Sequence, residues 1–401
     1  MRKIISIAAA LIGTASLVHS ALATSENTPG VTDTEIKLGQ TVPLSGPVSA
    51  YATFSRASLA YFAMINDRGG INGRKVTLIS VDDGFSPPKA VEQTRKLVES
   101  EGVFAIFAPV GSAPSAATQK YLNGQKVPQL LIQSGLARWN KPKEFPWSVT
   151  GLPNYEVEAA LYARYILKNM PQARVAVLYQ GDDFGLAYLN GLKTGFGARA
   201  GEMVASALSF QVTDPTVDSQ MLSLAASKAD VLLIAATTKQ TVQALRKMGE
   251  MNWHPQLFIS FVSSSPDRTY ALAGNENAKG AISAIVFKDP ADPDLVNAPD
   301  MKAYLTFMEK YYPAGDKNEG LNVAAYVEGE IMSELLRRCG NDLTRENLLR
   351  QASNFNDSKI PMISDGVVLR TEPDNYDLFR NPRLIRFDGK FNRSISDPTE
   401  P

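Results

Sequence analysis

The pattern of hydrophobic positions alternates between short apolar runs and longer stretches with helical spacing. The runs have the length and composition of strands buried in a parallel sheet. They lie at residues 103–107, 130–132, 175–179, 231–234 and 257–259, and two further strand candidates, which include polar residues, lie at 36–42 and 76–81. Between them, apolar residues recur every three or four positions, as in Leu59, Phe62 and Ala63, which predicts helices. Repeated strand–helix units predict an α/β fold of parallel sheets with helices on both faces.

This strand–helix alternation runs twice, with a break near residue 150. A chain of 401 residues also exceeds what one hydrophobic core usually serves, so two lobes are expected. No stretch rich in Gly or Ser separates the halves, and we therefore expect crossing strands to join them. The predicted lobes are residues 31–149 with 284–355, and residues 150–283 with 356–401.

The last third of the sequence is more helical. Met301, Tyr304, Leu305 and Met308 have the spacing of an amphipathic helix face. Strand-like stretches return near the end of the chain, at 366–369 and 384–387.

The first residues have the pattern of an export signal. Arg2 and Lys3 precede an apolar run over 4–18, and residues 21–23 form an A-x-A cleavage signature. The apolar run is shorter than the roughly 20 residues that span a bilayer. We predict a cleaved signal peptide over residues 1–23 and a mature protein in the periplasm.

Cysteine and histidine usage excludes several classes of function. Cys339 is the only cysteine, and apart from His19 in the signal segment the only histidine is His254. An intrachain disulfide and a His-rich zinc site are therefore excluded, and a Ser-His-Asp triad would depend on His254 alone. The G-x-S-x-G, G-x-x-x-x-G-K-[ST] and G-x-G-x-x-G motifs do not occur.

The charged residues restrict the possible functions further. Lys plus Arg and Asp plus Glu are both 41, which gives no basic field for nucleic acid. Paired acids at Asp82-Asp83 and Asp182-Asp183 follow predicted strands, where they could act as metal ligands, as acid–base groups, or as helix caps and loop residues. We predict a protein that is not an enzyme, needs no cofactor or metal and binds no nucleic acid.

Hydroxyl side chains stand in the turns after several strands. Ser45 follows the first strand, Ser112 the strand ending at Phe107, and Ser134 the strand ending at Ile132. In an open α/β sheet, ligands bind beyond the carboxyl ends of the strands, where helix N-termini favour negative charge. These serines could bind a carboxylate, or they could be ordinary caps and turn residues.

A spaced set of motifs resembles the periplasmic solute-binding proteins of branched-chain-amino-acid-type ABC transporters. The motifs are TVPLSGP at 41–47, INDRGGINGRK at 65–75, VDD at 81–83, VP at 127–128 leading to SG at 134–135, and YQGDDFG at 179–185. The resemblance extends from about Val31 to the end of the chain. It implies the type I periplasmic binding fold, in which two Rossmann-like lobes close by a hinge around a ligand. It also implies a monomer that delivers its ligand unchanged to a membrane permease.

Matched residue by residue, the resemblance suggests the binding site. It places Ser112 and the Ser134-Gly135 turn at the ligand carboxylate, and Tyr51 on the wall of the cleft. Phe184 stands where the family usually has a tyrosine.

The segment after the strand at 257–259 departs from the family pattern. Amino-acid binders of the family carry an acid nearby that neutralises the ligand's ammonium, whereas here no carboxylate occurs between Phe261 and Ser265. A buried ammonium without a counter-charge is strongly disfavoured. We therefore predict that the ligand is a small organic acid, aromatic or aliphatic, that has no amino group.

Aromatic side chains would contact the body of such a ligand. The candidates are Tyr51, Tyr155, Phe184, Phe261 and Tyr326. Tyr155 and Tyr326 lie on predicted helices and could equally belong to the core. The alternatives to this function are a branched-chain amino-acid binder, a ligand-binding sensor that docks on a receptor, and a secreted enzyme using Asp82, Asp83 or Asp182.

Overall fold

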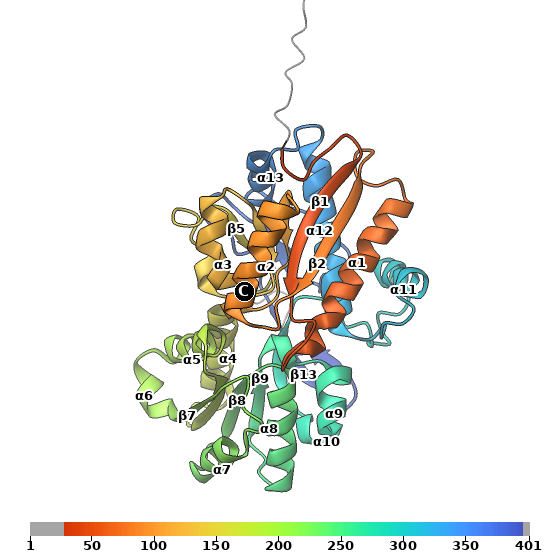
Figure 1. Cartoon of the computed structure of the whole chain (residues 1–401). Coiled ribbons are helices and arrows are strands. Elements are labelled where there is room, and N and C mark those ends of the chain that lie inside the picture. Colours follow the sequence, from red (N-terminus) through yellow and green to blue (C-terminus); the bar gives the residue numbers. More distant parts are fainter. Residues whose placement is uncertain (1–27, 396–401) are drawn as a thin grey trace, which may run out of the picture.

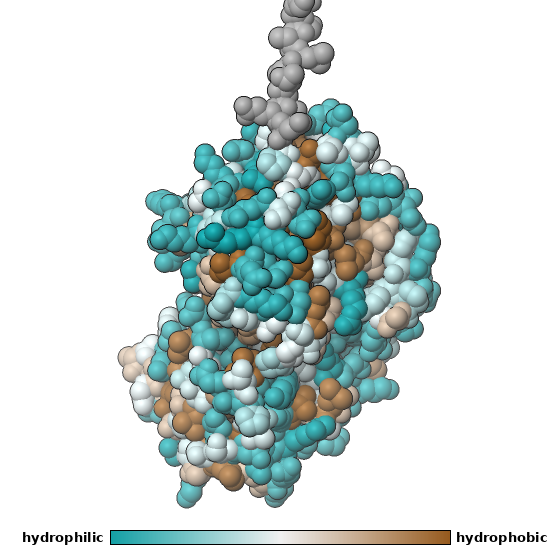
Figure 2. Space-filling view, viewed as in Figure 1, coloured by the Kyte–Doolittle hydropathy of each residue, from teal (hydrophilic) through white to brown (hydrophobic). Residues whose placement is uncertain are grey.

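The computed structural model describes residues 28–395, which form two lobes stacked end to end (Figure 1). The predicted signal peptide lies outside the described residues. No helix in the described part of the chain is both long and apolar enough to cross a membrane. The face shown in Figure 2 is covered mainly by hydrophilic residues, and a waist marks the boundary between the lobes.

The first lobe contains a parallel sheet with the strand order β2-β1-β3-β4-β5. These strands are β1 (Glu35–Val42), β2 (Lys75–Asp82), β3 (Ala105–Phe107), β4 (Gln129–Ile132) and β5 (Ser148–Thr150). Helices that belong to this lobe are α1 (Ala52–Asp67), α2 (Pro87–Arg95), α3 (Ser112–Gly124), α11 (Pro299–Tyr311), α12 (Gly320–Cys339) and α13 (Arg345–Ala352). The core under α1, α11 and α12 is rich in aromatic side chains, which include Tyr61 and Phe307.

The second lobe contains a sheet with the order β14-β13-β10-β9-β8-β6-β7. Its strands are β6 (Val175–Gln180), β7 (Val204–Phe210), β8 (Val231–Ala235), β9 (Gln256–Ile259), β10 (Ile282–Ile285), β13 (Arg383–Phe387) and β14 (Asn392–Ser394). Neighbouring strands among β7, β6, β8, β9 and β10 run parallel to one another, whereas β13 and β14 add an antiparallel edge. The longer helices of this lobe are α4 (Tyr155–Asn169), α5 (Asp183–Phe196), α7 (Asp218–Ala226) and α8 (Thr238–Glu250).

The chain crosses between the lobes at three places in the described residues: between β5 and α4, between β10 and α11, and between the short strand β12 (Phe379–Arg380) and β13. The third crossing divides the segment that we expected to lie wholly in the second lobe. Met362, Leu369 and Phe379 pack in the first core, and the Phe379 ring lies 5.4 Å from that of Phe287. Only β13 and β14 join the second sheet. The two lobes contain mainly parallel sheets and are joined by crossing segments of the chain, which confirms the expected fold class.

Candidate ligand-binding site

A cavity of about 140 Å³ lies between the lobes. Its wall is mainly apolar. The aromatic side chains that line it are Tyr51, Phe54, Phe85, Tyr155, Phe184, Phe261 and Phe287. Its polar lining consists of Ser112, Gln133, Gln180, Thr237, Ser264, Ser265, Arg268, Lys288, Asp289, Asn318 and Asn392. Such a wall suits a ligand with an apolar body and a few polar groups.

The N-terminus of α3 forms one polar part of this wall. Helix α3 begins at Ser112, and no side chain of the described residues caps it. The Ser112 side chain is buried in the cavity wall, with its Oγ 2.7 Å from Oγ of Ser134. Uncapped backbone N–H groups, the helix dipole and a hydroxyl together favour a bound carboxylate.

The backbone before α3 requires glycine. Gly111 has φ of 103°, and a Cβ atom at this position would overlap the ring of Phe85. Glycine is the residue that adopts this conformation without strain. Because Phe85 also lines the cavity, Gly111 lets an aromatic wall lie directly against the start of α3.

Ser134 and Gly135 lie behind the wall rather than in it. The carbonyl of Ser134 accepts a hydrogen bond from Thr150 Oγ1 at 2.9 Å, and that of Gly135 accepts one from the Tyr155 N–H at 2.8 Å. A Cβ atom at Gly135 would overlap the carbonyl oxygen of Pro153. The turn therefore supports Ser112 and holds the first lobe against the start of α4.

Tyr155 and Phe184 form the aromatic wall contributed by the second lobe. Each lies at the start of a capped helix: Asn154 accepts hydrogen bonds from the first turn of α4, and Asp182 does so for α5. The two ring centroids are 5.1 Å apart, in an edge-to-face arrangement. The side-chain caps thus fix the positions of both rings.

Phe261 is held by a buried carboxylate that sequence reasoning missed. Its N–H donates to Glu158 Oε1 at 2.8 Å, and the hydroxyls of Tyr162 and Tyr188 donate to the same carboxylate. Burial raises the pKa of Glu158 to about 7. The only signal in the sequence was an acid on the buried face of a helix, and its partners lie far away in the chain.

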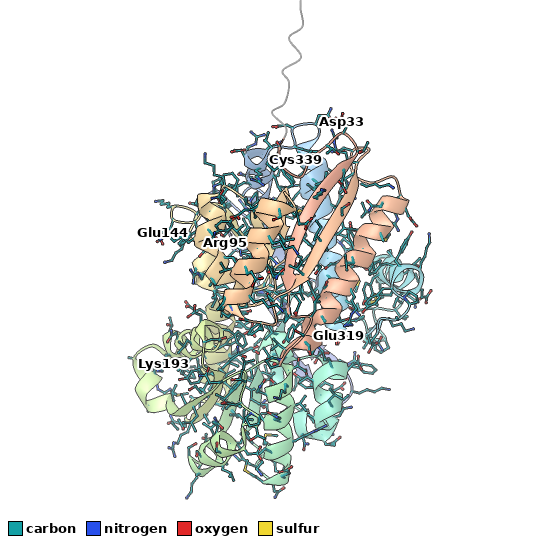
Figure 3. All side chains as sticks on the ribbon, in the orientation of Figure 1. Asp33, Arg95, Glu144, Lys193, Glu319 and Cys339 are labelled. Atoms are coloured by element: carbon teal, nitrogen blue, oxygen red, sulfur yellow. The ribbon has the colours of Figure 1, made fainter. Side chains whose placement is uncertain are left out.

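Tyr51 and Arg268 connect the lobes beside the cavity. The Tyr51 hydroxyl donates to the Val262 carbonyl at 3.1 Å, and the Arg268 guanidinium lies 5.0 Å from the Tyr51 ring centroid. Arg268 also forms an ion pair with Glu319 at 3.1 Å. Figure 3 shows Glu319 at the boundary between the lobes.

Tyr326 does not reach the cavity. Its ring packs in the first core against Tyr61, Tyr304 and Phe307, at centroid distances of 5.6, 5.6 and 5.1 Å. The reason is the orientation of α12, which turns this side of the helix toward α1 and α11.

The paired acids have structural partners. Asp82 accepts from the hydroxyl of Ser45 and pairs with Lys89, both at 2.7 Å, while Asp182 caps α5. Cys339 is buried in the first core. Among the residues that the structure describes, no group of three or more His, Cys, Asp or Glu side chains could hold a metal ion.

These features define a two-lobed α/β protein with a ligand cavity between its lobes. A family model described as "Periplasmic binding protein" matches residues 35–371, and the chain belongs to this family. The Leu/Ile/Val-binding protein BraC3 of Rhizobium johnstonii is 25% identical over 319 residues, which cover 77% of this chain and 80% of the relative. The Leu/Ile/Val-binding protein of Escherichia coli K12 is 27% identical over 216 residues, which cover 47% and 50%.

Solved structures show the same fold. A branched chain amino acid ABC transporter structure from Thermus thermophilus with bound valine has a TM-score of 0.81 at 14% identity and covers 92% of this chain and 97% of that one. A fatty acid ABC transporter substrate-binding protein from Thermomonospora curvata has a TM-score of 0.77 at 21% identity, with 93% and 94% covered. The predicted membership in this family is thereby confirmed.

Proposed function

We propose that the protein is the solute-binding component of an ABC importer. It binds a small molecule in the periplasm, without chemical change, and delivers it as a monomer to a membrane permease. The observation that carries this proposal is the apolar cavity between the lobes, with the uncapped start of α3 and Ser112 in its wall. Membership in the periplasmic binding protein family supports it.

The proposed ligand is a carboxylate with an apolar body, and branched-chain amino acids are the first candidates. Relatives named as Leu/Ile/Val-binding proteins support this choice. The cavity also offers an acid that our sequence argument did not consider. Asp289, which follows β10, lines the cavity.

An acid without an amino group is the second candidate. It is favoured by the stretch from Phe261 to Ser265, which has no carboxylate, and by the aromatic character of the lining. A structural neighbour described as a fatty acid binder supports this candidate.

A ligand screen tests the proposal. The purified protein would first be unfolded and refolded to remove bound ligand, and then screened for thermal shifts with leucine-type amino acids, aromatic acids and aliphatic acids. A ligand at about 100 times its Kd stabilises the folded state by about 2.7 kcal/mol. A shift with amino acids favours the first candidate, and a shift with acids alone favours the second. If none of these carboxylates shifts the melting temperature, the proposal fails.

The carboxylate position is tested by Ser112→Ala. Removing a buried hydroxyl that donates to a charged group should weaken binding of the ligand found in the screen by about 1–3 kcal/mol, measured by titration calorimetry. Ser45→Ala is the matched control, because the Ser45 hydroxyl bonds to Asp82 outside the cavity wall. Equal affinity of Ser112→Ala and the unaltered protein would place the carboxylate elsewhere.

A further inference from the structure

Phe85 is a residue of the cavity wall with an unfavourable backbone conformation. Its φ is 60°, in the left-handed region that bulky side chains rarely adopt. Among the described residues, it is the only aromatic residue with a positive φ. Such a conformation costs free energy and persists only where the surroundings enforce it, often at sites that bind ligands.

The paired acids before Phe85 hold the loop in this conformation. Asp83 is fully buried, and its Oδ1 accepts a hydrogen bond from the Phe85 N–H at 2.8 Å. Asp82 Oδ1 accepts from the Gly84 N–H at 2.9 Å and from the Ser45 N–H at 3.1 Å, which fixes the loop to the segment after β1. Asp83 Oδ2 has no hydrogen-bond partner in the described part of the chain, so this acid is itself costly to bury. Two unfavourable features, the positive φ and the buried acid, thus place one aromatic ring.

The Phe85 ring lies against the start of α3. Three of its carbon atoms are 2.4, 3.1 and 3.3 Å from the position that a Cβ atom would take on Gly111. Gly111 immediately precedes Ser112, where we place the carboxylate of the ligand. The first carbon atoms of a carboxylate bound there would therefore lie beside the ring.

From these observations we infer that Phe85 is a specificity-determining residue, whose ring limits the size of the ligand at the carbon next to its carboxylate. The ring cannot move aside without disturbing the hydrogen bonds that Asp82 and Asp83 make to its loop. A further methyl group on that carbon would meet the ring, and one extra carbon in a packed pocket changes affinity by about tenfold to 200-fold. This inference rests on the proposed function, because it takes the position of the carboxylate from Ser112.

Two pairs of acids that differ by one methyl group test the inference. They are 4-methylpentanoate with 2,4-dimethylpentanoate, and L-leucine with α-methyl-L-leucine. Each acid is titrated by calorimetry into the unaltered protein, Phe85→Ala and Phe85→Gly. In the pair that binds the unaltered protein, we expect the added methyl group to weaken binding by about tenfold or more. In both variants the ratio should fall below about threefold, because the space of the ring becomes free.

The two variants also test whether the loop is strained. Alanine keeps a Cβ atom at the positive φ, whereas glycine adopts this conformation without that penalty. Phe85→Gly should therefore melt about 2 °C higher than Phe85→Ala. An equal or lower melting temperature of Phe85→Gly would overturn the inference, because the loop would then not hold the ring against strain.

Leu321→Ala is the matched control, because Leu321 is an apolar residue in another part of the cavity wall. It precedes Glu328 by seven residues, which is about 10 Å along α12. Glu328 accepts a hydrogen bond from the side chain of Gln133, whose carbonyl accepts one from the Gly111 N–H. Leu321→Ala should weaken binding of both members of a pair and keep their ratio.

Two results of the titrations would overturn the inference and leave the proposed function standing. One is equal affinity of the unaltered protein for both members of the pair that binds, and the other is a ratio that survives in Phe85→Ala and Phe85→Gly. If none of the four acids binds the unaltered protein, the inference fails with them, and the wider ligand screen decides the proposed function separately.

Discussion

Glu158 is a buried side chain that positions residues of the cavity wall although it does not line the cavity itself. Its carboxylate accepts hydrogen bonds from the Phe261 N–H, from Tyr162 and from Tyr188. Tyr188 in turn stacks on Tyr155, with centroids 5.2 Å apart. Two aromatic side chains of the cavity therefore depend on this acid. Three donors offset the cost of burying the carboxylate only in part, and burial raises its pKa to about 7.

The raised pKa of Glu158 predicts a pH dependence of stability. The folded protein keeps the proton up to about pH 7, whereas the unfolded chain loses it near 4.5. The unfolded state therefore binds fewer protons between these values, and the free energy of unfolding falls as pH rises. Relative to Glu158→Gln, the unaltered protein should lose up to about 3 kcal/mol over this window, measured by urea unfolding.

The exposed Glu156, on the same helix, provides the control for Glu158. Glu156→Gln should keep the pH dependence of the unaltered protein. If Glu158→Gln keeps it as well, the buried carboxylate is not its source.

The predicted site residues differ in how far local sequence determines their positions. Ser112, Phe184 and Phe261 follow the ends of parallel strands, a position known from sequence, and the structure places all three in the cavity wall together with Tyr51 and Tyr155. Tyr326 sits mid-helix, and only the packing of α12 decides which way it faces. Asp289 and Asn392 meet through the third crossing of the chain, which no local pattern reveals.

At the scale of elements, most of the predicted strands are those with continuous apolar runs. The strands β5, β7 and β10 escaped prediction, and β7 is an edge strand whose residues are mostly half-buried. The spacing of Leu59, Phe62 and Ala63 predicted a helix but not its buried face. Leu59 is exposed, while Tyr61 and Met64 are buried. Small residues such as Ala57 and Ser58 make up much of the buried side of α1, and they give little hydrophobic signal.

For helix α3 we predict opposite effects of two glycine substitutions, one just before the helix and one in its last turn. In Gly111→Ala the new Cβ would meet the Phe85 ring at a positive φ, which should lower stability by about 1–3 kcal/mol and weaken ligand binding by displacing Phe85. Gly124→Ala, in the last turn of α3, meets nothing within 4 Å and should stabilise the helix by about 0.5–1 kcal/mol. Thermal unfolding of both variants checks this, and an unchanged Gly111→Ala would show that the turn has room to relax.

At the scale of the whole molecule, a small polar cluster connects the lobes beside the cavity. Arg268 belongs to the segment between β9 and β10, whereas Glu319 precedes α12 in the first lobe. Their side chains are 12% and 9% exposed, so the pair is shielded from water in this arrangement. Arg268 Nη1 also donates to Thr238 Oγ1 at 2.6 Å. If the lobes open by a hinge, the pair separates and both charges become hydrated.

Glu319→Gln should therefore favour the open arrangement. Glutamine can still accept the hydrogen bond from the Leu321 N–H. In the closed arrangement, however, it leaves the buried Arg268 charge without an anionic partner, which destabilises that arrangement relative to the open one. If the ligand binds to the closed arrangement, the Kd should rise about tenfold and the radius of gyration of the ligand-free protein should increase. Titration calorimetry and small-angle X-ray scattering measure the two effects.

Glu309→Gln, at an exposed position on α11, removes the same charge without touching the other lobe and should change neither the Kd nor the radius of gyration. A Glu319→Gln protein with the original Kd and scattering would show that the ion pair forms equally in the open and closed arrangements.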